Sequence, residues 1–135
     1  MDVTQIRLIV SDFPVVYRFY RDVIGLKPQF ETENGPYVAF KPDLGSTLAL
    51  HSRAELATII PDLKPGDGDN TLVALRVDDV DEYLAELTSR GASCTDPVVL
   101  DGRIKVSYLR DPEGHLLEIQ QWLATRTGAA VPPAS

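Results

Sequence analysis

The chain lacks the residues and segments that mark several classes of protein. Its 135 residues include one cysteine, Cys94, which rules out a disulfide within the chain. No apolar run approaches the roughly 18 residues that a membrane-spanning helix needs. The opening Met-Asp-Val-Thr-Gln has neither the basic nor the apolar part of a secretory signal. We therefore expect a cytoplasmic protein in a reducing environment, with no membrane partner.

Positive charge is also scarce. The chain has 13 lysines and arginines against 20 aspartates and glutamates, for a net charge of −7, and the basic residues form no cluster. Binding to a phosphate backbone needs a basic surface, so nucleic acid is excluded as a partner. The acidic balance keeps a protein soluble and is compatible with a cationic ligand. The 44% of hydrophobic residues suffices for the core of one domain.

The first half of the chain begins with a strand and a helix. Residues 3–10 are rich in β-branched side chains and roughly alternate in polarity, which predicts the strand. The helix is capped by Ser11 or Asp12 and ended by Gly25. Its apolar face repeats at helical spacing: Val16, Phe19, Tyr20 and Val23.

Three short strands and a second, shorter helix should follow. The strands are predicted at residues 27–33, 36–41 and 46–51. Asn34-Gly35 is a strong two-residue hairpin signal between the first two strands, and Asp43-Leu44-Gly45 should turn the chain into the third. Residues 52–60 predict the short helix, and the prolines, glycines and aspartates of 61–70 are typical of a loop.

The same order then recurs. Residues 71–77 predict a strand, Asp78 or Asp79 a helix cap, and Gly91 the end of that helix. The helix has an apolar face of its own: Val80, Tyr83, Leu84 and Leu87. Three strands are predicted after it, at residues 93–100, 103–110 and 115–122, with turns at Asp101-Gly102 and at Asp111-Pro112-Glu113-Gly114. Asp12 and Asp78 are 66 residues apart, as are Gly25 and Gly91, which indicates one supersecondary unit used twice.

This repeat predicts an α+β fold of two βαβββ modules. We divide the chain into a first module with its connecting segment at 1–63, a linker at 64–70, a second module at 71–124 and a disordered tail at 125–135. Two modules paired edge to edge would give one curved mixed sheet with the helices outside. The concave face would then carry no helix, which makes it a ligand cavity or a contact between two copies.

Two runs of sequence carry a family resemblance. Residues 7–26, which end in Phe-Tyr-Arg-Asp-Val-Ile-Gly-Leu, resemble the first strand and helix of the vicinal-oxygen-chelate superfamily, which includes glyoxalases, bleomycin-resistance proteins and dioxygenases. Residues 107–119 resemble its last hairpin, with an Asp-Pro-x-Gly turn and a glutamate on the final strand. The resemblance implies the glyoxalase/bleomycin-resistance fold. It does not imply one reaction, because this superfamily hosts several chemistries and non-catalytic binding proteins.

The resemblance also implies four metal-ligand positions, on the first and last strands of each module. In this chain they are Gln5, Ala49, Leu72 and Glu118. Ala49 and Leu72 have no donor atom, and stable divalent sites use three or more protein ligands. We therefore predict that the catalytic metal of the family is lost. The alternative is a divalent metal held by Gln5, His51 and Glu118.

Two residues are candidates for catalysis. Glu118 lies in an apolar strand, where a carboxylate could recognise a ligand or act as a general base, or could be a hydrogen-bonded cavity carboxylate without such a role. His51 suits proton transfer near neutral pH, but a surface histidine at a strand end is the more ordinary interpretation. His115, after the last turn, is interpreted as a surface residue, and Cys94 as structural.

Six residues are candidates for ligand binding. Arg7 shares strand parity with Gln5, and Arg76 shares it with Leu72, so both arginines should face the cavity and could bind a carboxylate or phosphate. The alternatives are a pair with Glu118 or a strand-end charge. The full set adds three aromatic side chains that could line a cavity or simply pack in the core: Gln5, Arg7, Tyr37, Arg76, Tyr108 and Trp122.

Three functions remain open from the sequence. The first is a metal-independent small-molecule binder of the bleomycin-resistance type. The second is a metal-dependent lyase, isomerase or dioxygenase that uses Glu118, with Gln5 and His51 as further candidates. The third is an interaction module whose cavity face is buried by a partner chain. A homodimer is expected under all three.

Overall fold

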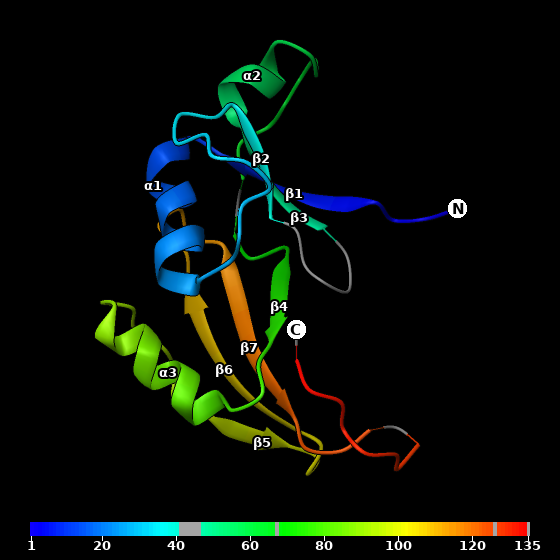
Figure 1. Ribbon diagram of the computed structural model, residues 1–135. Coiled ribbons are helices and arrows are strands. Elements are labelled where there is room, and N and C mark those ends of the chain that lie inside the picture. Colours follow the sequence, from blue (N-terminus) through cyan, green and yellow to red (C-terminus); the bar gives the residue numbers. More distant parts are fainter. Residues whose placement is uncertain (41–46, 67, 126, 135) are drawn as a thin grey trace. The chain divides into compact units, whose positions relative to one another are not determined.

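The computed structural model describes residues 1–40, 47–66, 68–125 and 127–134. The chain divides into two compact units, Met1–Gly68 and Asp69–Ser135, and Figure 1 shows a small sheet in each. The division falls inside the segment 64–70 that the composition marks as a linker. Within the described residues, no helix is both long enough and apolar enough to cross a membrane.

The first unit is a three-stranded sheet with one helical segment after its first strand and a short helix after its last. Its elements are β1 (Gln5–Val10), α1 (Phe13–Arg18), the π-helical segment η1 (Phe19–Ile24), β2 (Tyr37–Phe40), β3 (Thr47–Ser52) and α2 (Arg53–Ala57). The strand order is β1-β3-β2, with β1 parallel and β2 antiparallel to β3. The chain therefore returns from α1 and η1 to place its last strand in the middle of the sheet.

Local sequence signals explain where the first helical segment starts and stops. The Asp12 carboxylate accepts a hydrogen bond from the backbone N–H of Val15, as an N-cap residue does. Gly25 ends η1 with φ at 93°, a conformation that glycine adopts without steric cost. The buried rings of Tyr17 and Tyr20 pack against Phe40 on one face of the sheet. Both boundaries agree with the predicted cap and C-terminal glycine.

The predicted strand at 27–33 is wrong. The structure has one isolated bridge there, between Pro28 and Phe40, and Pro28 has no N–H to extend a ladder. The predicted Asn34-Gly35 hairpin is also wrong, because the turn is closed one residue earlier, by the N–H of Gly35 donating to the Thr32 carbonyl. A Cβ on Gly35 would lie 2.8 Å from the ring of Phe13, so the ring packs directly on the glycine backbone. The predicted turn at Asp43-Leu44-Gly45 lies outside the described residues.

The second unit is a complete βαβββ module. Its elements are β4 (Leu72–Arg76), α3 (Val80–Ser89), β5 (Val98–Leu100), β6 (Ile104–Arg110) and β7 (Leu116–Trp122). The strand order is β4-β7-β6-β5, with β4 parallel to β7 and the other neighbours antiparallel. As in the first unit, the first strand lies beside the last and parallel to it. The α+β fold of two sheet modules is thus confirmed, and its first module holds one strand fewer than predicted.

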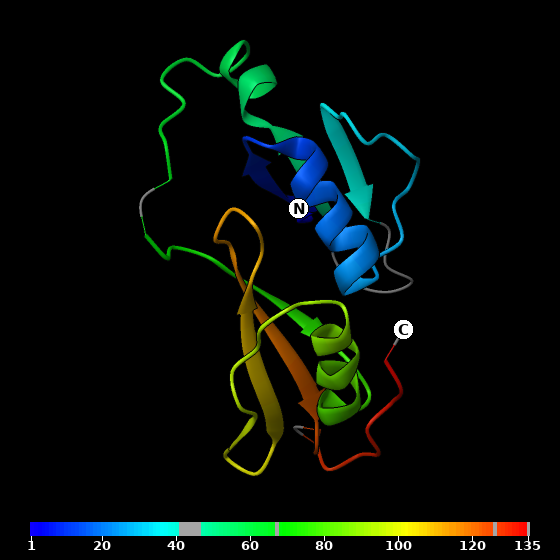
Figure 2. The same ribbon diagram turned by 90° about the vertical axis from the view of Figure 1, so that its left-hand side faces the viewer.

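Helix α3 covers one face of the second sheet, as Figure 2 shows from the helix side. Of the two predicted cap residues, Asp78 and Asp79, it is Asp79 that caps the helix. The Gln121 side chain of β7 accepts a hydrogen bond from the N–H of Val80 at the start of the helix. Buried Leu117 and Ile119 share this strand parity with Gln121. The odd-numbered residues of β7 therefore face α3.

The hairpin between β5 and β6 turns where the sequence predicts. Asp101 and Gly102 both have positive φ, and the N–H of Arg103 donates to the Leu100 carbonyl. The strand before it begins at Val98 and not at residue 93, since Pro97 removes a backbone donor. Cys94 consequently lies outside the strand, and burial raises the pKa of its thiol.

Candidate functional site

The candidate site is built from the sheet face that each unit turns away from its main helix. In the first unit, Phe40 packs against the helical segment α1–η1, so residues of the opposite parity form what we call the first far face. The register of β1, β3 and β2 gathers these residues there: Gln5, Arg7, Ile9, Tyr37, Ala39, Thr47, Ala49 and His51. All four site residues that the sequence predicts in this half therefore share one face.

His51 connects two charged groups on the first far face. Its Nδ1 lies 3.1 Å from Nη1 of Arg7, and its Nε2 lies 3.0 Å from a carboxylate oxygen of Glu55. A guanidinium can only donate, so Nδ1 must be the acceptor. The proton of the neutral ring is then on Nε2, where it donates to Glu55. His51 thus holds Arg7 in place while its own orientation is fixed by Glu55.

Two further contacts complete this cluster. Nε2 of Gln5 donates to the Tyr37 hydroxyl at 2.9 Å, and the Tyr37 ring meets the His51 ring edge-on with 5.5 Å between centroids. Two predicted site residues, Gln5 and Tyr37, therefore contact each other, and Tyr37 also contacts His51.

Two findings differ from the sequence interpretation of this face. His51 is buried, with 8% of its surface exposed, so the interpretation as a surface strand-end histidine is wrong. Glu55 was not predicted. It comes from α2, whose cap Ser52 accepts from the N–H of Glu55. The four-residue spacing from His51 to Glu55 across the cap was the available signal.

The second far face is the side of the second sheet turned away from α3. Because Leu117, Ile119 and Gln121 face the helix, the even-numbered residues of β7 and their register partners lie on the opposite side. The face holds these residues: Leu72, Ala74, Arg76, Val98, Leu100, Ile104, Val106, Tyr108, Arg110, Leu116, Glu118, Gln120 and Trp122. The four site residues predicted in this half are all among them.

A continuous chain of hydrogen bonds crosses the second far face. The indole N–H of Trp122 donates to Oε1 of Gln120 at 2.8 Å, and Nε2 of Gln120 donates to Oε1 of Glu118 at 2.8 Å. Tyr108, opposite Glu118 in the register, hydrogen-bonds to the same carboxylate, which raises the pKa of the Tyr108 hydroxyl. Gln120 is not among the predicted site residues, although it shares strand parity with Glu118 and Trp122.

Arg76 lies at the Trp122 end of this series of hydrogen bonds. Its guanidinium carbon lies 4.0 Å from the centroid of the Trp122 ring, which is a cation–π contact. Nη2 of Arg76 donates to the backbone carbonyl of Pro132 in the segment 127–134, which has no helix or strand. Arg76 is the last residue of β4, as the strand-end alternative from the sequence has it, and its guanidinium contacts Trp122 and Pro132 where the other alternative was a pair with Glu118.

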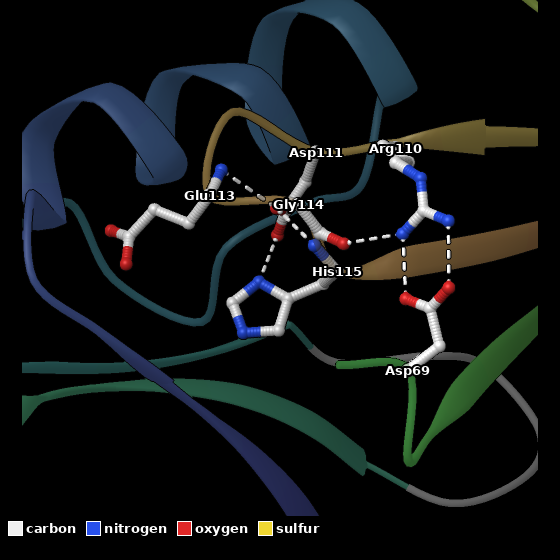
Figure 3. Close-up of polar contacts among 6 residues, drawn as sticks. All are labelled: Asp69, Arg110, Asp111, Glu113, Gly114 and His115. Atoms are coloured by element: carbon white, nitrogen blue, oxygen red, sulfur yellow. Dashed lines mark hydrogen bonds and ion pairs between the residues drawn. The ribbon is translucent and has the colours of Figure 1, made fainter. Parts of the chain in front are cut away.

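The turn between β6 and β7 fixes the register of these residues (Figure 3). The buried carboxylate of Asp111 accepts from the N–H groups of Glu113 and His115, both at 2.9 Å, and from Nδ1 of His115 at 2.6 Å. Arg110 pairs with both carboxylate oxygens of Asp69 at 2.7 and 2.8 Å. His115 follows the turn as predicted and keeps 27% of its side chain exposed, while its ring is bonded to Asp111.

Comparison with known proteins assigns the family. A sequence model of the Glyoxalase/Bleomycin resistance protein/Dioxygenase superfamily matches residues 2–119. The chain belongs to this superfamily. It is 32% identical to the uncharacterized protein YraH of Bacillus subtilis (strain 168) over 130 residues, which cover 91% of this chain and 100% of YraH.

Several solved structures share the fold of this chain. A glyoxalase/bleomycin resistance protein/dioxygenase from Nocardioides aligns with a TM-score of 0.73 at 20% identity, over 98% of this chain and 90% of that chain. TnmS3, an antibiotic binding protein from Streptomyces sp. CB03234, aligns with a TM-score of 0.69 at 22% identity, over 90% and 96%. At these identities the likeness concerns the fold.

The four metal-ligand positions of the superfamily can be compared with this geometry. Gln5 and Ala49 lie on the first far face, and Leu72 and Glu118 on the second. The side chains of Ala49 and Leu72 have no atom that can ligate a metal. Those of Gln5 and Glu118 are hydrogen-bonded to neighbouring side chains. Among residues 1–40, 47–66, 68–125 and 127–134, no three His, Cys, Asp or Glu side chains gather as a metal site would require. This donor set does not fit a divalent cation.

Proposed function

We propose that this superfamily member binds an organic small molecule on the far faces of its sheets, without the divalent metal of the family. The observation that carries the proposal is the polar and aromatic chain of Tyr108, Glu118, Gln120, Trp122 and Arg76 on the second far face. Binding sites commonly combine apolar and aromatic surface with a few positioned polar groups.

Two further points support binding without metal. The chain has hydrocarbon side chains, Ala49 and Leu72, at two of the four ligand positions. An antibiotic binding protein is among the proteins that share the fold, so the scaffold can present a ligand surface.

An enzymatic function of the lyase, isomerase or dioxygenase kind is the alternative, with Glu118 and His51 as catalytic residues. The contacts of His51 favour binding over catalysis, because both ring nitrogens are engaged by Arg7 and Glu55. If a substrate is found, a Glu118→Gln variant with full turnover would remove Glu118 as a general base. An interaction module or homodimer that buries these faces would be recognised by its molar mass in light scattering.

A thermal-shift screen tests the proposal. Indole, benzamidine and 2-naphthoate sample neutral, cationic and anionic aromatic ligands, each in EDTA and again with Zn²⁺, Ni²⁺ or Mn²⁺. A ligand at a hundred times its Kd adds about 2.7 kcal/mol to the free energy of unfolding. We expect stabilisation by at least one organic probe in EDTA. Stabilisation by metal alone would overturn the proposal.

Two adjacent glutamines of β7 provide a matched control. Gln120 points to the second far face, whereas Gln121 accepts from the N–H of Val80 on the helix side. We expect Gln120→Ala to weaken binding of the stabilising probe with little change in stability. Gln121→Ala should lower stability by about 1 kcal/mol and leave the affinity unchanged. The reverse pattern would exclude the second far face as the ligand surface.

A further inference from the structure

Arg76 has an unused hydrogen-bonding position on the second far face. Its Nη2 donates to the Pro132 carbonyl, while its Nε is buried and has no hydrogen-bond partner among the residues that the structure describes. A buried donor without an acceptor is unfavourable, and more so in a charged group. The present arrangement therefore satisfies the guanidinium only in part.

The geometry of the guanidinium defines what would satisfy it. Nε–H and one N–H of Nη2 point in parallel from the same edge of the plane. The two oxygens of a carboxylate can accept from both of these N–H groups, whereas one carbonyl oxygen accepts from one of them. The Trp122 ring, 4.0 Å from the guanidinium carbon, holds the plane in a fixed orientation.

The charge of Arg76 is also available. Within the described residues, the ion pairs of the second unit use other cations, Arg90, Lys105, Arg110 and His115. Glu118, the carboxylate on the same face, is bonded to Tyr108 and Gln120. Arg76 therefore remains a positive charge for an external anion.

Apolar side chains accompany this charge. In the register, Trp122 is opposite Ile104, and Ile104 is opposite Leu100. Trp122, Leu100 and Val98 are 39%, 42% and 50% exposed. Such a surface can cover an apolar ligand body next to the arginine.

We propose that Arg76 binds the carboxylate of an apolar organic acid, and that the segment 127–134 is an internal competitor for the same guanidinium edge. This inference rests on the proposed function, since it names the ligand class for the second far face. Among the described residues, Gly128 and Ala129 of the segment are bonded to Thr125, and Pro132 and Ala134 to Arg76 and Asp78. Besides the bond to Arg76, the N–H of Ala134 donates to Asp78 at 2.6 Å. A charge-assisted bidentate pair is stronger than a bond to a neutral carbonyl, so the acid displaces the segment.

The first test measures binding of 2-naphthoate and of 2-naphthamide, its neutral analogue, to the full chain by isothermal titration. We expect naphthoate to bind more tightly, and Arg76→Gln to remove about tenfold to a hundredfold of that affinity. Arg103→Gln is the control, since it removes the same charge from an exposed turn residue of the same unit. A chain of net charge −7 repels anions in general, so tight naphthoate binding requires a local site.

The second test loosens the competing segment without shortening the chain. Pro132→Gly together with Pro133→Gly keeps every backbone carbonyl and raises the conformational entropy of the undocked segment. We expect naphthoate to bind roughly threefold to tenfold more tightly to this variant, and to lose that gain when Arg76→Gln is added. Unchanged affinity would contradict competition by the segment.

The outcomes separate this inference from the proposed function. If indole or benzamidine binds through Gln120 while naphthoate and naphthamide bind equally and Arg76→Gln has no effect, the inference is wrong and the proposed function stands. If no organic probe binds, both are wrong.

Discussion

The two far faces place an arginine on matching strands and use it differently. Arg7 lies on β1 and Arg76 on β4, the first strand of each unit, each beside the parallel last strand. Arg7 is bonded to the imidazole of His51, which is bonded in turn to Glu55. Arg76 stacks on Trp122 instead and reaches a neutral carbonyl.

This difference shows how one fold places an arginine in two chemical environments. Strand register decides which residues share a face, and it is alike in both units. The neighbouring side chains then decide whether the charge of the arginine is offset within the protein. On the first far face a carboxylate offsets it through His51. On the second far face the arginine contacts an indole and a neutral carbonyl instead.

The largest effect is expected from breaking the turn that sets the register of the second far face. Asp111→Ala removes the acceptor of two backbone N–H groups and of the His115 ring. We expect the free energy of unfolding to fall by about 2–4 kcal/mol, measured by urea denaturation, because the bonds to this buried carboxylate are charge-assisted.

The exposed pair in the same region provides the control. Asp69 and Arg110 are each 51% exposed in their side chains, and Asp69→Ala should lower stability by less than about 1 kcal/mol. Equal losses from Asp69→Ala and Asp111→Ala would refute the assignment of the turn to Asp111.

A smaller effect is expected from breaking the first far face. His51→Ala deprives Arg7 and Glu55 of their partner, and both can then bind water because each reaches the surface. We expect a loss of about 1 kcal/mol in the free energy of unfolding. A loss as large as that of Asp111→Ala would mean that this face serves mainly to stabilise the fold.

The histidines of the two units differ in the hydrogen-bonding role of Nδ1. Nδ1 of His51 accepts from Arg7, whereas Nδ1 of His115 must donate to the Asp111 carboxylate. Nitrogen-15 spectra of the histidine rings near neutral pH should therefore show an unprotonated Nδ1 for His51 and a protonated one for His115. The same Nδ1 state in both rings would contradict the assigned contacts.

The smallest effect concerns the titration of Tyr108. Its hydrogen bond to Glu118 raises its pKa, so folded Tyr108 holds its proton more tightly than unfolded Tyr108 does. The resulting stabilisation is complete below the ordinary tyrosine pKa of about 10 and is lost as the pH rises through the raised value. Glu118→Gln should lower the Tyr108 pKa, measured by tyrosinate absorbance against Tyr108→Phe.

Tyr83 serves as the internal standard for that titration. Its pKa is raised to about 12, mainly by burial in α3, and it should not respond to Glu118→Gln. If Tyr83 shifts and Tyr108 does not, the hydrogen bond to Glu118 is refuted.

Local patterns predicted much of the framework on which the site is built. Asp12 as a helix cap, Gly25 as a helix end and the Asp101-Gly102 turn depend on the backbone preferences of a few adjacent residues. Strand parity depends only on the pleat, so it correctly put Arg7 with Gln5 and Arg76 with Leu72.

Contacts made between elements could not be predicted in the same way. Pro28 stands in a segment with strand-like composition, but its missing donor limits pairing to one bridge. Glu55 reaches His51 from a separate helix, and Pro132 reaches Arg76 across 56 residues of chain. Nothing in the local sequence of Arg76 indicates that partner, because it depends on where the last segment folds back.

The most direct test of metal-independent binding is an NMR titration of EDTA-treated protein with indole, benzamidine and 2-naphthoate. We expect a bound probe to shift the Trp122 indole N–H and the Gln120 side-chain amide, which lie on the second far face. The Gln121 amide and the Leu117 methyls, on the helix side, should move little. Binding that appears only after a divalent metal is added, or shifts confined to Gln121 and Leu117, would contradict this expectation.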